Sequence, residues 1–404
     1  MTDDTRKKAF QLIILFGMVS LFGDIIYEGA RSVNGPYLKT LGASAALVGL
    51  IGGAGEFVGY AIRLVSGYFA DRTHAYWFFT FLGYGLLVSV PLLALTGIWQ
   101  VAAIFIVVER LGKALRSPAK DTILSQAAQQ IGTGWGFGLN EAMDQIGALL
   151  GPLMFTLLFM STGRAVQKLS DYQHGYALLW IPFVLLIACV VVAFRCIPNP
   201  EALEDKKSRL GEPEALSKIF WLYNAFSFLT AMGFIGFILM GYHFKNIGIL
   251  TDAQIPFFYA IAMGVDGLAA LVIGKYYDVL KDKHQKEHAG LLMLVFVPLV
   301  SALIPVLAFA RSFVMVVVAV VLWGIVMGAH ETIMKAAIAD LTPLRKRGTG
   351  YGIFNATYGI AMLAGGALMG FLYDISVPLM VLTASLIQFA ALPVFFMMKR
   401  EIKR

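Results

Sequence analysis

Residues 109–152 read ERLGKALRSPAKDTILSQAAQQIGTGWGFGLNEAMDQIGALLGP; they begin inside one long apolar segment and end inside the next. The polar middle of this stretch turns the chain round between the two segments. If both segments cross a lipid bilayer, each charge at mid-depth costs at least ~2.5–3.5 kcal/mol. A shorter version of the stretch recurs in the second half of the chain. We therefore expect two adjacent membrane spans whose charges serve the function.

The whole chain has the composition of a membrane protein. Of its 404 residues, 58% are hydrophobic and 14% are charged, and the mean hydropathy is +0.74. A soluble domain is ~45–50% apolar and ~25% charged, so one soluble core cannot bury the excess. The basic residues lie between the apolar segments, so the net charge of +7 does not indicate a nucleic-acid partner. The expected surrounding is the lipid bilayer.

Twelve segments are predicted to span the membrane, because a span needs ~20 mostly apolar residues. They are residues 10–33, 44–66, 76–97, 99–119, 135–160, 175–196, 218–243, 254–274, 289–310, 313–335, 350–372 and 377–398. The long polar connection 197–217 is predicted to be a linker. We therefore expect an all-α membrane protein with two six-helix halves, residues 1–196 and 218–404, and no soluble enzyme domain.

Lysine and arginine predict how the chain is oriented. If the N-terminus lies in the cytoplasm, the connections on that side hold 22 of these residues, the connections on the other side hold five, and the spans hold five. Basic residues are retained on the cytoplasmic side. We therefore expect a multi-pass protein of the plasma (cytoplasmic) membrane, with both termini cytoplasmic, that acts as a monomer.

Two short motifs occur once in each half. Gly67 and Asp71, followed by Arg72, come after the second predicted span, and Gly274 and Asp278 come after the eighth. Matching motifs at equivalent places predict two parallel, pseudo-symmetric six-helix repeats, an arrangement found in one large class of transporters.

Glycines open the fifth predicted span of each half. GTGWG at 132–136 includes Gly134, and GTGYG at 348–352 includes Gly350. A helix N-terminus carries about +0.5 charge and favours an anion. We hypothesise that Asp71 caps the helix opened by Gly350, and that Asp278 caps the helix opened by Gly134. These contacts would close the cytoplasmic side. The alternative is that each aspartate caps only its own loop.

On these motifs the chain resembles the major facilitator superfamily over essentially its whole length. The Gly67–Arg72 segment looks like the inner loop motif of that family. Residues 73–76 differ from the basic end of the motif, so the ion pairs of that end are not implied here. The resemblance implies twelve helices, secondary active transport and alternating access.

The fifth predicted span resembles the helix 5 motif of antiporters in that family, without the closing pair of glycines. The matching residues are Gly138, Gly147, Gly151 and Pro152. Arg110 is similar to the helix 4 arginine of the family, although Gly112 stands nearer to it than the usual glycine. Asp24, Glu28 and the charged runs of 109–152 look like a bacterial subgroup that includes heavy-metal resistance permeases.

Residues with charged or polar side chains inside the predicted spans are the candidate substrate and proton pathway, since each should face protein or water and have a partner. They are Asp24, Glu28, Arg31, Glu56, Arg110, Lys113, Asn140, Glu141, Asp144, Asp266, His330 and Glu331. Asp24, Glu28 and Arg31 share one helix face. Either Glu28 simply pairs with Arg31, or the three residues form a stripe that faces a cavity.

Charges on neighbouring spans are expected to meet. Arg110 and Lys113 are predicted to face Glu141 and Asp144, and Glu56 needs a partner on another helix. The contacts are either a static salt-bridge network or pairs that exchange partners during transport. Since the first half holds most of these charges, we expect that half to handle protons or ions.

The sequence thus predicts a secondary active transporter that exports a small polar or charged organic solute by proton-coupled antiport. The candidate proton carriers are Asp24, Glu28, Glu141 and Asp144; Arg31, Arg110 and Lys113 would oppose them or bind an anionic group of the solute. The alternative is a divalent transition-metal exporter that uses Asp24, Glu28 and His243. A receptor or scaffold would need a partner domain that the sequence lacks.

The sequence has no motif typical of ATP-driven pumping or of catalysis. GxxxxGK[ST], HExxH and the nucleophile elbow are all absent. We therefore expect neither an enzyme nor a cofactor nor a resident metal.

Overall fold

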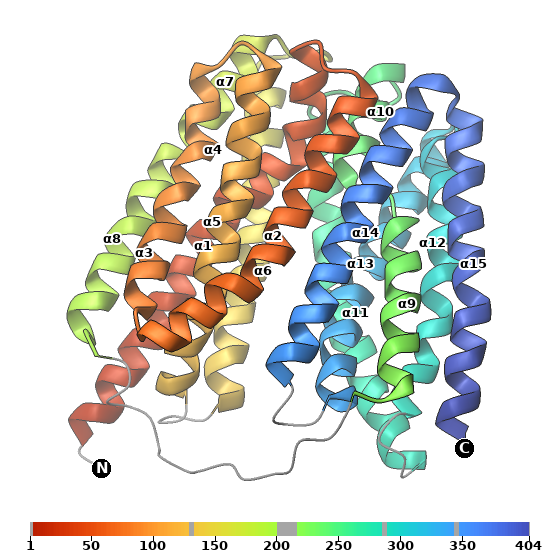
Figure 1. Ribbon diagram of the computed structural model, residues 1–404. Helices are drawn as coiled ribbons and strands as arrows, with labels where there is room; N and C mark the ends of the chain where they lie inside the picture. Colours follow the sequence, from red (N-terminus) through yellow and green to blue (C-terminus); the bar gives the residue numbers. More distant parts are fainter. Residues whose placement is uncertain (1–2, 129–132, 200–215, 285–288, 343–346, 404) are drawn as a thin grey trace.

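The computed structural model describes residues 3–128, 133–199, 216–284, 289–342 and 347–403. These residues form helices joined by short connections, and no strand occurs among them. Figure 1 shows the helices as a bundle in which α1 to α8 lie together on one side and α9 to α15 on the other. Both chain ends lie at the same end of the bundle. We call this the termini end, and we call the opposite end the far end.

The first group of helices comes from the residues before the central linker. Its elements are α1 (Asp3–Thr40), α2 (Ala45–Thr73), α3 (Tyr76–Gly85), η1 (Leu86–Val88), α4 (Ser89–Leu92), η2 (Leu93–Leu95), α5 (Trp99–Ala128), α6 (Thr133–Ser161), α7 (Leu169–Leu178) and α8 (Trp180–Cys196). The predicted third span, 76–97, is therefore a series of short α- and 3₁₀-helical pieces.

The second group comes from the residues after the linker. Its elements are α9 (Lys218–Met232), α10 (Phe237–Ile247), α11 (Gln254–His284), η4 (Ala289–Val295), α12 (Phe296–Ala308), α13 (Phe313–Leu341), α14 (Arg347–Ile375) and α15 (Val377–Lys403). The predicted seventh span, 218–243, is broken between α9 and α10 around Gly233 and Gly236. Most of the predicted linker lies outside the described residues.

Within the part of the chain that the structure describes, ten helical segments are long and apolar enough to cross a membrane. Two predicted spans are not among them. The span 99–119 lies in α5, whose apolar stretch carries Glu109, Arg110 and Lys113, and the span 289–310 contains a shorter apolar helix, Met293–Ala308. The all-helical membrane fold is confirmed, whereas the count of twelve spans and the pseudo-symmetry stay predictions.

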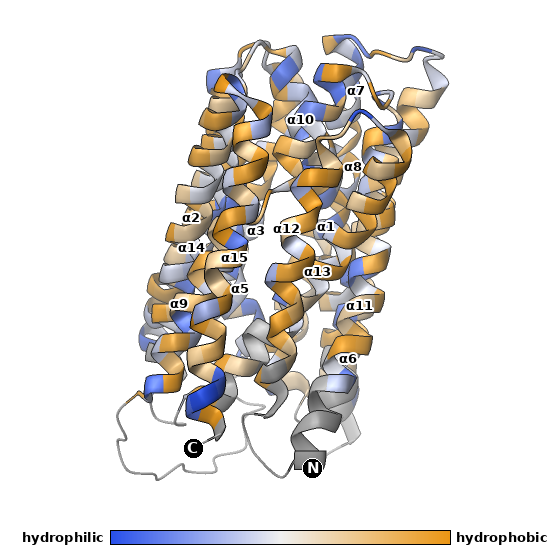
Figure 2. Cartoon of the chain, turned by 90° about the vertical axis from the view of Figure 1, so that its right-hand side faces the viewer, coloured by the Kyte–Doolittle hydropathy of each residue, from blue (hydrophilic) through white to orange (hydrophobic). Residues whose placement is uncertain are grey.

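The outer surface of the bundle is apolar along much of its height. Figure 2 shows hydrophobic residues along the helices and hydrophilic residues gathered toward the connections of the far end. Large side chains such as Leu157, Leu271 and Leu382 are more than half exposed. Because a helix satisfies its own backbone hydrogen bonds, such a surface is suited to contact lipid tails.

Glycines allow two helix pairs to approach backbone to backbone. On α2, a Cβ added to Gly49 would lie 2.2 Å from the carbonyl oxygen of Gly366 in α14. On α6, a Cβ added to Gly147 would lie 2.5 Å from the carbonyl oxygen of Leu21 in α1, and one on Gly151 would lie 2.4 Å from that of Ile25. Small residues at such crossings are typical of membrane helices.

Candidate functional site

A cavity of about 630 Å³ lies between the two groups of helices. Its lining reaches Arg63 near the end of α2, Asp121 near the end of α5 and Gly138 near the start of α6, which are the helix ends on the termini side. Nine of the predicted pathway residues line it: Asp24, Glu28, Arg31, Lys113, Asn140, Glu141, Asp144, Asp266 and His330. The side chain of Glu331 lies outside the described residues. The sequence therefore identified most of the charged wall of the cavity.

A row of ion pairs crosses α1, α2 and α5 at the deep end of this cavity. Arg31 contacts Glu28 at 3.1 Å and Glu56 at 3.0 Å, and the same Glu56 oxygen lies 3.2 Å from Arg110. Arg110 also contacts Glu109 at 3.3 Å. Two arginines share one carboxylate, so Glu56 holds three helices together. The prediction that Glu56 finds its partner on another helix is confirmed.

Glu28 is both paired locally and turned toward the cavity. Its carboxylate is buried, accepts a hydrogen bond from Arg31 one turn away, and accepts another from the hydroxyl of Tyr259 in α11. Both expectations for the stripe on α1 are therefore met, since Asp24, Glu28 and Arg31 all line the cavity. Tyr259 is the contact through which the second group of helices joins this network.

The predicted pairing of Arg110 and Lys113 with Glu141 and Asp144 is wrong. Arg110 turns toward α2 and pairs with Glu56 and Glu109. Glycines of α2 leave the space that it fills: a Cβ on Gly55 would lie 3.0 Å from its Cγ. The sequence could not show which faces of α5 and α6 meet, because this depends on how each helix is rotated about its axis.

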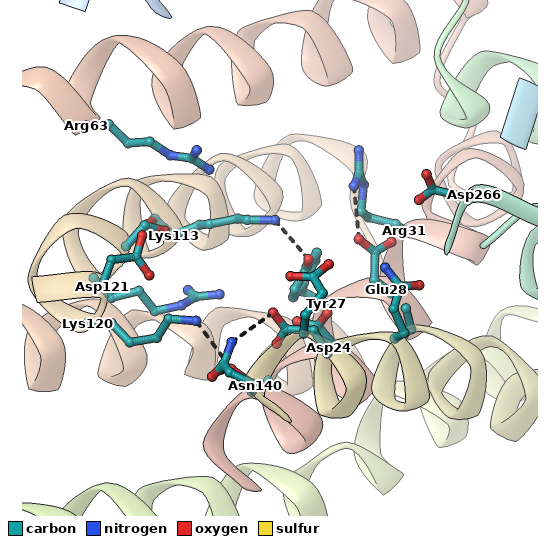
Figure 3. Close-up of a pocket in the computed structure, with 18 of the residues that line it drawn as sticks. Asp24, Tyr27, Glu28, Arg31, Arg63, Lys113, Lys120, Asp121, Asn140 and Asp266 are labelled. Atoms are coloured by element: carbon teal, nitrogen blue, oxygen red, sulfur yellow. Dashed lines mark hydrogen bonds and ion pairs between the residues drawn. The ribbon is translucent and has the colours of Figure 1, made fainter. Parts of the chain in front are cut away.

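Lys113 contacts a tyrosine and no carboxylate among the residues that the structure describes. Its Nζ donates to the hydroxyl of Tyr27 at 2.9 Å and lies 4.0 Å from the centre of that ring. Figure 3 shows Lys113, Arg63 and Lys120 extending in the same direction, toward the side where Tyr27 and Asp24 lie. The cations of α2 and α5 thus face the carboxylates of α1.

A chain of hydrogen bonds runs along the wall formed by α5, α1 and α6. Lys120 donates to Ser20 at 3.3 Å, Ser20 donates to Asn140 at 2.9 Å, and Asn140 donates to Asp144 at 3.4 Å. Each of these side chains lines the cavity. Such a chain connects the termini side of the cavity with Asp144 through polar groups.

Asp24 and Asp144 belong to the same helix crossing. A Cβ on Gly147 would lie 2.8 Å from the Cβ of Asp24, and Asp144 precedes Gly147 by one turn of α6. Both aspartates line the cavity. Two ionised carboxylates at one crossing repel each other.

The second group of helices contributes mainly apolar and aromatic side chains to the cavity. These are Met263, Met327, Phe354 and Tyr358, beside the polar Asp266, His330 and Asn355. His330 is buried, and its Nδ1 lies 3.0 Å from the hydroxyl of Tyr358. The local contact agrees with a hydrogen-bonding role for this histidine.

A smaller pocket of about 130 Å³ adjoins the main cavity on the side of the far end. Arg31, Arg63 and Lys113 line both spaces. The rest of the small pocket is formed by glycines of α2 and α14 and by an aromatic group around the break between α9 and α10. In that group Phe234 stacks on Trp323 at 5.8 Å, and Phe237 meets Tyr259 at 4.6 Å. Glu56 and Arg110, predicted for the pathway, line this pocket only.

This arrangement can be compared with known proteins. The sequence profile of the Major Facilitator Superfamily matches residues 13–301 and 282–404. The chain belongs to the Major Facilitator Superfamily. It is 39% identical over 394 residues to an uncharacterized protein of Mycobacterium tuberculosis, a match that covers 96% of this chain and 93% of the relative. It is 26% identical to an uncharacterized MFS-type transporter of Methanocaldococcus jannaschii, covering 93% of this chain and 91% of that one.

The fold of the superfamily also appears in solved structures. The crystal structure of the nucleoside transporter NupG matches with a TM-score of 0.71 over 95% of this chain and 99% of NupG, at 14% sequence identity. At that identity the likeness concerns the fold alone. The resemblance that the sequence motifs indicated is thus confirmed, and members of this superfamily are transporters, not enzymes.

The residues of the antiporter-like motif, Gly138, Gly147, Gly151 and Pro152, differ in what they contact. Gly147 and Gly151 bring α6 against α1, and the carbonyl of Pro152 accepts a hydrogen bond from Thr156 at 3.0 Å. Gly138 differs, because it lines the cavity and a Cβ there would meet nothing within 4 Å. The motif therefore sets the α1–α6 crossing that carries Asp24.

Gly67, Asp71 and Arg72, the gate residues predicted at the end of α2, do not line the cavity. Asp71 is exposed and accepts a 3.5 Å hydrogen bond from Tyr76 in its own loop, while Arg72 donates to Tyr68 at 2.9 Å. Gly67 lies against Pro118. Among the described residues, no hydrogen bond or ion pair joins Asp71 to α14. The capping of α14 by Asp71 stays a prediction.

The other half of the predicted gate is described only in part. Gly134 and Gly350 stand near the starts of α6 and α14, and Gly274 lies in α11 against Thr332. The side chain of Asp278 lies outside the described residues.

The three residues of the metal alternative are not brought together. Asp24 and Glu28 line the cavity, whereas His243 is buried on α10 with its Nδ1 2.8 Å from the hydroxyl of Tyr373. His243 lines neither the cavity nor the adjoining pocket. No group of three metal-binding side chains occurs within the described ranges.

Sequence reasoning missed several cations and tyrosines of the lining as site residues: Arg63, Arg116, Lys120, Tyr27, Tyr60 and Tyr84. A helical spacing could have found some of them. Arg116 and Lys120 follow Lys113 at three and seven residues, and Arg63 follows Glu56 at seven, so each continues the face of a residue already chosen.

Proposed function

We propose that the protein is a secondary active transporter that exports a small polar or charged organic solute in exchange for protons. Membership of the Major Facilitator Superfamily indicates membrane transport by alternating access. The observation that supports the finer proposal is the pair of aspartates, Asp24 and Asp144, at one helix crossing inside a cavity of about 630 Å³. The direction of transport rests on the antiporter-like motif around Gly147.

Contacts at the far end support the proposal that this structure represents one state of the alternating cycle. The carboxylate of Asp374, near the end of α14, accepts hydrogen bonds from the backbone N–H groups of Ala45 at 3.2 Å and Ala46 at 2.8 Å. It therefore caps the N-terminus of α2, where a negative charge is favoured. α2 and α14 are thus tied at the far end, while the cavity reaches the termini side.

A second contact ties the two groups of helices at the far end. Asp252, before α11, accepts a 2.7 Å hydrogen bond from the backbone N–H of Gln167, before α7, and its own N–H donates to Ala165 at 2.9 Å. Lys245 also pairs with Asp252. The contacts of Asp374 and of Asp252 must break before the far end can open. They would thus act as a gate at the far end, as the predicted gate residues would at the termini end.

The proposed cycle assigns the proton to the aspartates of the α1–α6 crossing. When both are ionised, their repulsion favours the uptake of a proton. The hydrogen-bonded side chains Lys120, Ser20 and Asn140 give the route from the termini side to the aspartates a polar wall. A bound proton removes one negative charge from the wall opposite Lys113 and Arg63, and so changes the charge balance that the solute meets in the same cavity.

The two groups of helices are proposed as the moving units of this cycle. We assign residues 1–196 to one half and 218–404 to the other, joined by a cytoplasmic linker at 197–217. Both termini and the open side of the cavity then face the cytoplasm, in agreement with the lysine and arginine bias of the connections. We propose that one chain suffices as the working unit in the plasma membrane.

Proteoliposomes test the proposed function. Purified protein is reconstituted, a pH gradient is imposed, and candidate organic solutes are added one at a time while an enclosed dye reports the internal pH. A solute that moves protons across the membrane through the wild-type protein, but not through Asp24→Asn, supports antiport. Solute movement that proceeds at the same rate with no pH gradient and no pH change would overturn the proton-coupled proposal.

A further inference from the structure

The cations of the cavity wall differ from those of the ion-pair network in what they contact. Among the described residues, Arg63, Lys113 and Arg116 form no ion pair with a carboxylate. Each lies over a tyrosine ring: Arg63 over Tyr60 at 5.2 Å, and Lys113 over Tyr27 at 4.0 Å. A tyrosine ring holds a cation in place without forming an ion pair with it.

The third cation shows the same pattern. Arg116 lies over Tyr84 at 4.8 Å, it is 5% exposed, and its buried Nη1 has no hydrogen-bond partner among the described residues. Arg63 likewise has a buried Nε without a partner. A buried donor that stays unsatisfied costs roughly 1–3 kcal/mol. Both arginines line the cavity, so their guanidinium groups bring positive charge to its wall that no ion pair within the described residues neutralises.

The charged residues that line the adjoining small pocket indicate that the binding group is negatively charged. The pocket's described lining contains four cations, Arg31, Arg63, Arg110 and Lys113, and one carboxylate, Glu56. That carboxylate is already shared by Arg31 and Arg110. The free cationic groups are therefore Arg63 and Lys113, which stand where the small pocket meets the main cavity. The carboxylates of the main cavity, including Asp24 and Asp144, do not line the small pocket.

The remaining walls of the small pocket indicate the body of the ligand. They are formed by Phe237, Trp323 and Met362 and by backbone exposed at glycines of α2. The volume is about 130 Å³, and an engineered apolar cavity of ~150 Å³ in another protein takes up benzene. The pocket thus suits one ring or a short aliphatic group.

We infer that the transported solute is an organic acid with a compact apolar body. Its acidic group binds between Arg63 and Lys113, and its apolar part enters the small pocket beside Trp323. This inference rests on the proposed transport function and names the class of its substrate. It leaves Asp24 and Asp144 on the opposite wall to carry the proton.

Three compounds of one shape and different charge test the inference. Benzoate, benzamide and benzamidine carry a negative, a neutral and a positive group on the same ring. Their binding to the purified full-length protein is measured by calorimetry at neutral pH. We expect benzoate to bind at least about tenfold more tightly than either of the others, a difference of about 1.4 kcal/mol. Equal binding of all three, tighter binding of benzamidine, or binding of none would overturn the inference.

Two variants locate the acidic group. Lys113→Gln and Arg63→Gln should each weaken benzoate binding about tenfold or more, because each removes a charged hydrogen-bond donor. The matched control is Lys39→Gln: Lys39 also lies over a tyrosine, Tyr242 at 5.0 Å, but outside both spaces. Unchanged benzoate affinity in Lys113→Gln and Arg63→Gln, measured on protein whose thermal unfolding is unaltered, would contradict the assignment.

Failure of this inference and failure of the proposed function give different results. If the substrate class is wrong, proton movement in proteoliposomes accompanies a solute that is not an anion, and Asp24→Asn still abolishes it. If proton coupling is wrong, benzoate binds as described, but anion transport proceeds without any change of internal pH. If both are right, Asp24→Asn retains benzoate binding and loses the coupled proton movement.

Discussion

The two halves of the chain contribute different chemistry to one cavity. The first half supplies Asp24, Glu28, Arg31, Lys113 and Asp144, together with most of the other charged side chains. The second half supplies methionines, aromatic rings and glycine backbone, with Asp266 as its carboxylate in the described lining. In the proposed cycle this difference becomes a division of roles: the first half would hold protons and the charged group of the solute, and the second half would surround much of its apolar part.

The same difference appears in how each half is held together. Charges inside α1, α2 and α5 are paired with one another through Glu56, so that half must stay assembled to keep its charges satisfied. The described interior of the second half relies on aromatic stacking, such as Phe234 on Trp323. Substitutions should therefore affect the two halves in different ways, and the following predictions test this.

The largest expected effect is on proton coupling. Asp24→Asn should lower proton-driven transport at least about a hundredfold, because it removes an ionisable carboxylate from the α1–α6 crossing. Asp266→Asn, which changes the carboxylate of the second half, should lower it less than about tenfold. Both are measured as initial rates in proteoliposomes under the same pH gradient. An equal loss of transport rate in Asp24→Asn and Asp266→Asn would contradict the proposal that the first half carries the proton.

The next largest effect is on stability. Glu56→Gln leaves Arg31 and Arg110 without their shared carboxylate, and breaking a buried ion pair costs about 3–5 kcal/mol. The control Glu401→Gln breaks the pair with the exposed Lys218, which should cost no more than about 1 kcal/mol. Denaturant-induced unfolding of the purified variants gives both values. If Glu56→Gln lowered the free energy of unfolding no more than Glu401→Gln does, the ion pairs would not be what holds α1, α2 and α5 together.

A smaller effect is expected at the α1–α6 crossing. Gly147→Ala places a methyl group against Leu21 and Asp24, and such overpacking costs about 1–3 kcal/mol. Gly138→Ala, on the same helix but facing open space, should be neutral or slightly stabilising. The unfolding midpoints of the two variants are compared directly. An unfolding midpoint that is lower for Gly138→Ala than for Gly147→Ala would contradict the packing role of the motif.

The smallest expected effect concerns the far end. Asp374→Asn weakens the cap on α2 by about 1 kcal/mol, so the far end should open several-fold more often. A cysteine at Met362, in a chain whose Cys189 and Cys196 are serine, should then react several-fold faster with an impermeant thiol reagent added on that side. Asp71→Asn, at the termini end, should not raise this reaction. An equal rise in both variants would contradict the role of Asp374.

The all-helical fold could be predicted from sequence because apolar length alone identifies most spans. The fourth predicted span, 99–119, was difficult to identify because the charged residues that serve the site also lower its hydropathy. Among the charges that depress the hydropathy of α5, Arg110 lines the small pocket and Lys113 lines both spaces. The break of the predicted 218–243 span into α9 and α10 had only weak signals, Gly233 and Gly236.

The members of the site could largely be predicted, whereas their partners could not. Depth in a span follows from counting residues, and this placed Asp24, Asp144 and Asp266 at the cavity. Partners depend on how each helix is rotated and where glycine allows close approach, as Gly55 does for Arg110. The tyrosines beneath Arg63, Lys113 and Arg116 were missed because a sequence does not show which ring lies under which cation.

One comparison of two transport modes tests the central claim most directly. Proteoliposomes containing wild-type protein, Asp24→Asn or Arg63→Gln are assayed with radiolabelled phenylphosphonate, which stays ionised and does not cross lipid unaided. We predict that Asp24→Asn retains phenylphosphonate exchange across the membrane and loses transport driven by a pH gradient, whereas Arg63→Gln loses both. Loss of both modes in Asp24→Asn together with retention of both in Arg63→Gln would contradict the account.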